Sequence, residues 1–245
     1  MSTQTVRTID RTARARELPL VDLPPLNPGD TLSRAEFERI YEAHPEIKKA
    51  ELIEGVVHMP SPIRIAQHSE PHSWIIVWLG VYLSATPGVR LGDNGTVRLD
   101  LENEVQPDAF LRIETERGGK SRVTSDDYLE GPPELIAEIA ASSAAYDLHI
   151  KKRVYQRSGA QEYLAVQMHD KRVDWFVLRE GVYATLTPDA SGILRSEVFP
   201  GLWLNGEVFW DGDLAAMLAT LRQGLASPEH AEFVARMKME TKQSQ

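Results

Sequence analysis

Residues 133–140 read Pro-Glu-Leu-Ile-Ala-Glu-Ile-Ala, an apolar run that Glu138 interrupts. Prolines precede the run and the small residues 141–143 follow it, which is typical of a central β-strand. Residues 144–158 then carry a helical pattern that Gly159 ends, and residues 162–167 alternate like another strand. Because a strand, a helix and a second strand follow one another, we expect a strand–helix–strand unit in a mixed sheet.

The sequence on either side extends this unit to an α/β (α+β) domain with a mixed central β-sheet flanked by helices. A capping box of Ser33 and Glu36 predicts a helix from Arg34 to about Ala43. The stretch 114–125, with basic residues and a Gly pair, is expected to be a flexible loop. Further elements are expected as a hairpin over 50–59, a buried helix over 68–83, strands over 95–101, 108–113 and 172–178, and a helix over 214–225.

The length and composition favour one domain. With 245 residues and 42% hydrophobic content, the chain can bury one substantial core, whereas two domains would each be small. Residues 1–30, rich in Thr, Arg and Pro, are expected to form a flexible N-terminal arm. The single domain would then span 31–225, and 226–245 would be a C-terminal tail with a helical pattern.

Charge and cysteine content exclude several classes of protein. A net charge of −9 argues against a protein that coats nucleic acid non-specifically, although site carboxylates offset by a metal keep a nuclease open. The absence of cysteine excludes disulfides and thiolate metal sites and is compatible with a reducing cytoplasm. No segment approaches the roughly 20 apolar residues that span a bilayer. We therefore expect a cytoplasmic protein with no membrane contact.

Two acids stand where packing explains them poorly. Asp108 follows Pro107 at the start of an expected strand, where a turn residue is the simple structural explanation. Glu138 lies inside an apolar strand, and burial of a carboxylate is unfavourable unless it is paired or bound to a metal. Strand alternation places Ile136, Glu138 and Ala140 on one face, so a solvent-facing Glu138 is the structural alternative.

A polar ladder follows on the next helix, because Asp147, Lys151 and Tyr155 share one face through i, i+4 spacing. A surface Asp–Lys pair worth about 0.3–0.5 kcal/mol would explain this ladder structurally. The functional interpretation is a Mg²⁺ site: carboxylates bind a hard cation, and a lysine stabilises phosphorane charge or holds the attacking water. The order of these residues within one strand–loop–strand–loop–helix unit favours the second interpretation.

His68 and the basic loop are further candidates. His68 and His72 have the i, i+4 spacing of metal-binding histidines, but the Glu of the zinc-protease pattern is missing. His68 would otherwise pack or hydrogen-bond at a helix start, and in a nuclease it would contact a phosphate or support an acid. Arg117, Lys120 and Arg122 would bind nucleic-acid phosphates if their loop borders the site, and would otherwise be solvated.

Together these motifs resemble the Uma2 family, formerly a domain of unknown function, which is placed in the PD-(D/E)XK restriction-endonuclease-like superfamily. The resemblance covers about residues 30–212, and it depends on the joint order of motifs that are weak singly. The matching segments are 50–55 (AELIEG), 67–68 (QH), 106–109 (QPDA), 132–139 (PPELIAEI), Asp147 with Lys151 and Tyr155, 158–163 (SGAQEY) and 199–202 (FPGL).

The resemblance implies a core sheet flanked by helices, with Asp108 and Glu138 as ligands of Mg²⁺ (or Mn²⁺) and Glu51 as an additional acid. The chain departs from the superfamily pattern at Ala140, where the pattern calls for a lysine. Lys151 on the following helix fits that displaced role. The Ser-Pro-Ser-Thr-like stretch that usually follows the strand reads Ala-Ser-Ser-Ala at 141–144, which changes a loop beside the site.

We therefore expect a Mg²⁺-dependent endonuclease that hydrolyses DNA phosphodiester bonds and forms a homodimer. A non-catalytic binding or regulatory protein that keeps the fold is the alternative, and a hydrolase of small phosphate substrates is a third. The expected catalytic residues are Glu51, Asp108, Glu138 and Lys151, supported by His68, Asp147 and Tyr155, with Arg117, Lys120 and Arg122 as DNA contacts.

Overall fold

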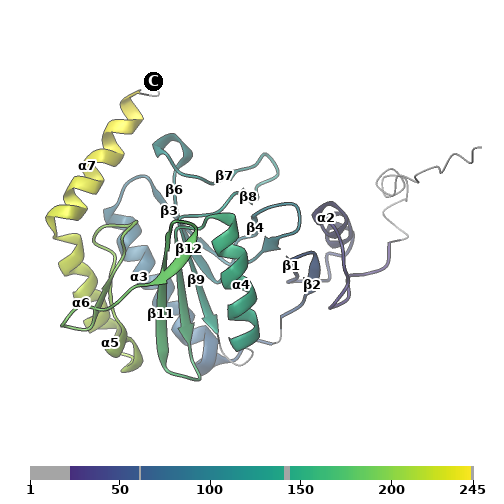
Figure 1. Cartoon of the computed structure of the whole chain (residues 1–245), viewed down its shortest axis with the longest axis horizontal. Helices are drawn as coiled ribbons and strands as arrows, with labels where there is room; N and C mark the ends of the chain where they lie inside the picture. The colour runs from purple at the N-terminus through teal and green to yellow at the C-terminus, as the bar shows by residue number, and fades with distance from the viewer. Residues whose placement is uncertain (1–22, 61, 141–143, 244–245) are drawn as a thin grey trace, which may run out of the picture.

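A computed structural model describes residues 23–60, 62–140 and 144–243 (Figure 1). Its main sheet has the strand order β12-β11-β10-β9-β6-β3. Strands β9 and β10 are parallel and are connected by helix α4, while the other neighbouring pairs are antiparallel. The mixed sheet and the strand–helix–strand unit are as expected. The strands are β3 Val89–Asp93, β6 Ala109–Ile113, β9 Leu135–Ala140, β10 Glu162–Gln167, β11 Arg172–Arg179 and β12 Val182–Thr185, and the helix is α4 Ala144–Ser158.

A second sheet of six short strands has the order β2-β1-β5-β4-β8-β7. Helix α2 (Arg34–Ala43) packs over it through Phe37, and its N-terminus has the predicted capping box of Ser33 and Glu36. In place of the strand expected over 95–101, the structure has the two-residue strand β4. The chain turns back after it, and the Asp100 carboxylate accepts a hydrogen bond from the Asn103 side-chain amide in this turn. The strands are β1 Glu51–Ile53, β2 Val56–His58, β4 Val97–Arg98, β5 Glu104–Val105, β7 Arg122–Val123 and β8 Leu129–Glu130.

The main sheet is covered on both faces (Figure 1). On one face, helices α3, α6 and α7 enclose the larger core, where Trp78 packs edge-on against Trp175 at 5.8 Å. On the other face, α4 packs Tyr155 against Tyr163 at 5.2 Å. The remaining elements are η2 Ile65–Ser69, α3 Glu70–Ala85, η3 Thr115–Arg117, β13 Ile193–Arg195, β14 Trp203–Asn205, α5 Gly206–Trp210, α6 Leu214–Leu225 and α7 Pro228–Gln243.

Several local expectations differ from the structure. The helix expected from residue 68 begins as α3 at Glu70 and is preceded by the π-helical turn η2, in which His68 lies. Residues 1–22 of the expected arm lie outside the described residues, but Leu26 is buried against α2, because this apolar side chain completes the small core. In the expected tail, α7 buries Phe233.

No helix in the described residues is long and apolar enough to span a membrane.

Candidate active site

Four predicted site residues meet where the two sheets and α4 come together. Glu51 begins β1, Asp108 immediately precedes β6, Glu138 lies in β9 and Lys151 lies in α4. The antiparallel register of β6 and β9 brings the main chain of Asp108 beside that of Glu138. The three acids are 4–8% exposed. The fold therefore gathers carboxylates from three separate strand regions into one buried cluster.

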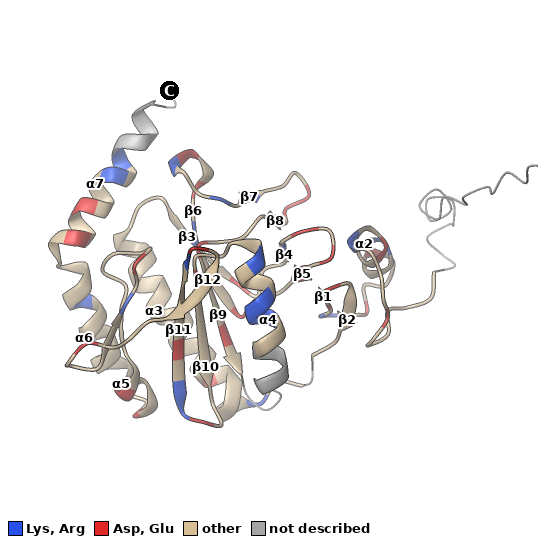
Figure 2. Cartoon of the chain, in the orientation of Figure 1, with Lys and Arg blue, Asp and Glu red and all other residues tan. Residues whose placement is uncertain are grey.

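The Lys151 ammonium bridges two of these acids. Its Nζ lies 3.0 Å from Glu51 Oε1 and 3.0 Å from Glu138 Oε1. Glu51 Oε1 also accepts from the Gln106 amide at 2.8 Å, and Glu138 Oε1 accepts from the Tyr155 hydroxyl at 2.6 Å. In Figure 2, Lys and Arg gather on the middle of α4, close to acidic residues of the sheet. Lys151 and Tyr155, predicted on one helix face, are thus one contact group.

The electrostatics of this group follow from its burial. Burial raises the pKa of Glu138 to about 7, since the attraction of Lys151 only partly offsets the lost hydration, and Asp108 and Glu51 add repulsion. For Lys151, burial alone would lower the pKa, but Glu138 and Glu51 outweigh that effect and raise it. Lys151 is therefore a cation at neutral pH, whereas Glu138 gains and loses its proton near neutral pH.

His68 supplies a second cation beside Asp108. Its Nδ1 lies 3.0 Å from the Ile139 carbonyl oxygen, and its Nε2 lies 3.4 Å from Asp108 Oδ1. A carbonyl and a carboxylate only accept hydrogen bonds, so both ring nitrogens carry protons and the ring is an imidazolium. In agreement, the hydrogen bond with Asp108 raises the pKa of His68. The π-helical turn, a feature frequent at functional sites, holds this ring in place.

Asp108 is held on several sides. Its Oδ2 accepts from the Ile139 amide at 2.8 Å, and its backbone oxygen lies 2.9 Å from His72 Nε2. Burial acts to raise the pKa of Asp108, but the hydrogen bond and charge of His68 lower it overall. Asp108 is thus ionised. The Ile139 peptide group binds both Asp108 and His68 and could not be found from sequence, because backbone contacts leave no residue-type signal and only the register reveals them.

The donor chemistry of the cluster fits a hard divalent cation. Glu51 and Glu138 each use only Oε1 for hydrogen bonds within the described residues, which leaves both Oε2 atoms available. Oxygen donors of this kind are the ligands that Mg²⁺ prefers. Among the described residues, no three His, Asp or Glu side chains are placed so that they could hold a metal ion together. Lys151 and the His68 imidazolium instead neutralise the carboxylates, and a metal would enter by displacing one of them.

The basic loop is not brought to this cluster. Asp108 precedes β6, whereas the loop follows it, so the five residues of β6, roughly 17 Å of strand, separate them. Arg117 pairs with Glu114. Arg122 pairs with Glu130, and Lys120 is exposed. Asp147 lies in α4, but its side chain is outside the described residues.

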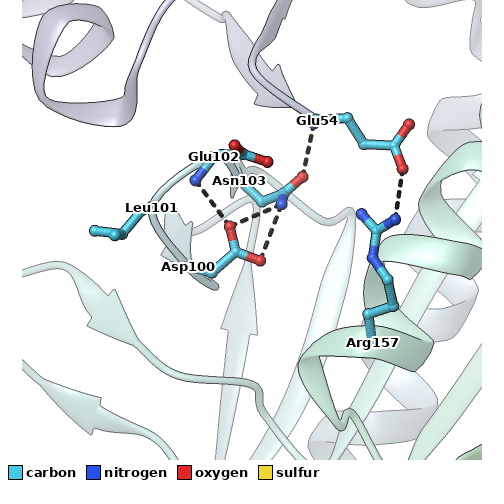
Figure 3. A pocket seen from close by; sticks show the side chains of 6 residues that line it. All are labelled: Glu54, Asp100, Leu101, Glu102, Asn103 and Arg157. Atoms are coloured by element: carbon cyan, nitrogen blue, oxygen red, sulfur yellow. Dashed lines mark hydrogen bonds and ion pairs between the residues drawn. The ribbon is translucent and has the colours of Figure 1, made fainter.

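A shallow hollow of about 630 Å³ lies further along α4 (Figure 3). Arg157 on α4 pairs with Glu54 in the β1–β2 turn at 2.8 Å, two turns beyond Lys151. The Glu54 amide donates to Asn103 on the opposite wall. The hollow contains one ion pair, and it shares no lining residue with the carboxylate cluster. Its lining residues are Glu54, Asp100, Leu101, Glu102, Asn103 and Arg157.

Comparisons with known proteins identify the family and the fold. The Uma2 family model, described as "Putative restriction endonuclease", matches residues 34–207. Among solved structures, a "putative nuclease belonging to DUF820" from Anabaena variabilis is similar, with a TM-score of 0.54 and 14% identity over 78% of this chain and 99% of that one. No curated protein matches. The likeness to the solved structure shows the restriction-endonuclease-like fold, and the family match shows that the chain belongs to the Uma2 family.

Proposed function

We propose that this protein is a Mg²⁺- or Mn²⁺-dependent endonuclease that hydrolyses phosphodiester bonds of DNA. The observation that carries the proposal is the Lys151 ammonium, held 3.0 Å from both Glu51 and Glu138 beside the ionised Asp108. The family description supports a nuclease, and restriction endonucleases generally use divalent metals. A homodimer, in which two sites address two strands, and a cytoplasmic location belong to the same proposal.

Each residue has a chemical role in this reaction. Asp108 and Glu138 would hold the metal, which supplies a Lewis acid and lowers the pKa of bound water. Lys151 positions the attacking water or neutralises the charge that develops on the phosphoryl group. Glu51 and Tyr155 keep the Lys151–Glu138 pair aligned through their hydrogen bonds. His68 and the Ile139 amide hold the two oxygens of Asp108 in place, and a metal would take one of these oxygens from its present partner.

A second candidate is a non-catalytic binding protein that keeps the nuclease fold. Its supporting observation is that Lys151 and the His68 imidazolium already neutralise the buried carboxylates. The net charge of −9 also disfavours tight binding to a polyanion. The two candidates differ in whether a divalent metal binds and whether DNA is cut.

Cleavage of supercoiled plasmid in Mg²⁺ by wild type, Asp108→Asn and Glu104→Gln tests the proposal. Glu104 is a matched control, since it is 3% exposed and Asp108 is 4% exposed. Burial raises the pKa of Glu104 to about 8, so glutamine resembles its neutral state. We expect Asp108→Asn to lower the rate by at least about 100-fold, as for the loss of an essential charge interaction, with Glu104→Gln unchanged. Equal cleavage by Asp108→Asn and wild type would reject the assignment.

A further inference from the structure

Two isoleucines are exposed beside the candidate active site. Most large apolar side chains of the described chain are buried, but Ile63 is 61% exposed and Ile65 is 67% exposed. All residues from 62 to 67 are exposed. We call the residues Pro62–Ile65 the 62–65 segment. Two isoleucines exposed this close together are unfavourable in water unless a partner covers them.

The 62–65 segment is rigidly connected to the carboxylate cluster. It leads into the π-helical turn, where the Arg64 carbonyl oxygen accepts from the amides of His68 at 3.1 Å and Ser69 at 3.2 Å. His68 in turn contacts Asp108 and Ile139. Pro62 fixes its own φ. Ile65, at the start of the π-helical turn, therefore lies within about one helical turn of His68, and Ile63 is two residues before it.

Arg64 is a cation within the same segment, and Lys49 is a cation near the cluster, where its charge acts on His68 and Asp108. Arg64 donates to Gln67 Oε1 at 3.3 Å and makes no ion pair within the part of the chain that the structure describes. Lys49 donates a hydrogen bond to the side chain of Asn94. The Asn94 amide donates in turn to Asp93, whose carboxylate contacts His72 beside the cluster.

Four arginines elsewhere in the described chain do have acidic partners. Arg153 and Arg157 pair with Glu54, and Arg117 and Arg122 also have acidic partners. Positive charge that is free to meet a phosphate is thus present beside the exposed isoleucines.

We propose, resting on the nuclease function above, that the substrate is duplex DNA bent at the site, with Ile63 and Ile65 inserted against its base stack. Arg64 and Lys49 would bind the flanking phosphates. Apolar wedges beside basic residues are how many proteins open a base step and kink a duplex. The occupant is a polyanion rather than a second copy of this chain, because Arg64 has no acidic partner within the described residues, and two side chains bury far less area than a stable interface between copies.

Binding to a 20-base-pair duplex carrying a fluorophore on each end tests this inference, with Ca²⁺ in place of Mg²⁺. Anisotropy gives the affinity, and energy transfer between the ends reports bending. The apolar variant is Ile63→Ser with Ile65→Ser, and its control is Val182→Ser, since Val182 is also 61% exposed but lies on β12. The charge variant is Arg64→Gln, with exposed Arg222→Gln as its control.

We expect wild type to bind and bend the duplex, and the apolar double variant to bind at least about tenfold more weakly, without the gain in energy transfer and with an unchanged salt dependence. Arg64→Gln should lower the slope of log affinity against log salt by about one. Both controls should behave as wild type. Full affinity and bending by the apolar double variant would overturn the inference.

Sedimentation of the same variants distinguishes a second copy as the occupant. A wild-type dimer that the apolar double variant converts to monomer would also overturn the inference. The inference and the nuclease function fail separately. If the wild type binds and bends the duplex but never cuts it in Mg²⁺, the DNA-bending inference stands and the nuclease function is rejected.

Discussion

The Lys151 ammonium and the Glu138 carboxylate lie 3.0 Å apart, with side chains only 12% and 10% exposed, although one residue is in α4 and the other in β9. Both charges are removed from most water, and such a pair is favourable only when its geometry is good and its remaining atoms are bonded. The Tyr155 hydroxyl and Glu51 provide those bonds. The pair therefore joins the chemistry of the site to the stability of the fold.

Replacing Lys151 by methionine should destabilise the protein by about 3–5 kcal/mol, because it leaves two buried carboxylates without their cation. Adding Glu138→Gln should cost less than the sum of the two single changes, with a coupling of about 0.5–3 kcal/mol. Urea unfolding gives these free energies. Lys152→Met is the neighbouring control, since Lys152 lies over the Phe176 ring and has no buried ion pair in the described structure. Equal destabilisation by the two lysine substitutions would contradict the account.

The ion pair of His68 and Asp108 should make stability depend on pH. The raised pKa of His68 means that its contribution is complete below the ordinary value of 6.5 and is lost as pH rises through the folded-state pKa. The lowered pKa of Asp108 means that its contribution is complete above 3.8 and is lost as pH falls through the folded-state pKa.

The pair should therefore contribute fully between pH 3.8 and 6.5. In metal-free buffer, the melting-temperature difference between wild type and His68→Asn should be largest near pH 6 and smaller at pH 8. As a control, substitution of the exposed His169, which pairs with the exposed Asp170, should show little of this pattern. A difference that grows above pH 7 would mean that His68 is not the cation described.

Two helical glycines should respond oppositely to alanine. A Cβ on Gly224 in α6 would lie 2.2 Å from the Gly201 carbonyl oxygen and 2.8 Å from Trp203. A Cβ on Gly80 in α3 would meet no atom within 4 Å. Gly224→Ala should destabilise by more than about 1–3 kcal/mol, as overpacking against backbone does, and Gly80→Ala should stabilise by roughly 0.5–1 kcal/mol. Thermal unfolding of both variants checks the packing of α6, and a tolerated Gly224→Ala would contradict it.

The unit from β9 to β10 could be predicted from sequence because its signals are local. The apolar run gives β9, and Gly159, with φ of +85°, ends α4 at Ser158 as expected. The capping box of Ser33 and Glu36 is likewise a contact between near neighbours. The shared helical face also placed Lys151 and Tyr155 correctly relative to each other.

The rest depends on contacts between distant segments. In the second sheet, the β1–β2 hairpin was predicted over 50–59, but the other four strands have two residues each, too short for a periodic pattern. The bond from the Ile139 amide to Asp108 depends on the register of β6 against β9. Spacing suggested a metal-binding pair for His68 and His72, whereas the structure gives His68 two acceptors of its own. These features follow from tertiary packing and carry no signature in residue type.

Calorimetric titration with Mn²⁺ at pH 7.5 measures whether the carboxylate cluster binds a divalent metal. We predict one Mn²⁺ per chain for wild type and for Glu104→Gln, and at least tenfold weaker binding for Asp108→Asn, as expected when a ligand is lost. No binding by wild type, or equal binding by Asp108→Asn, would contradict the account and favour the non-catalytic binding protein.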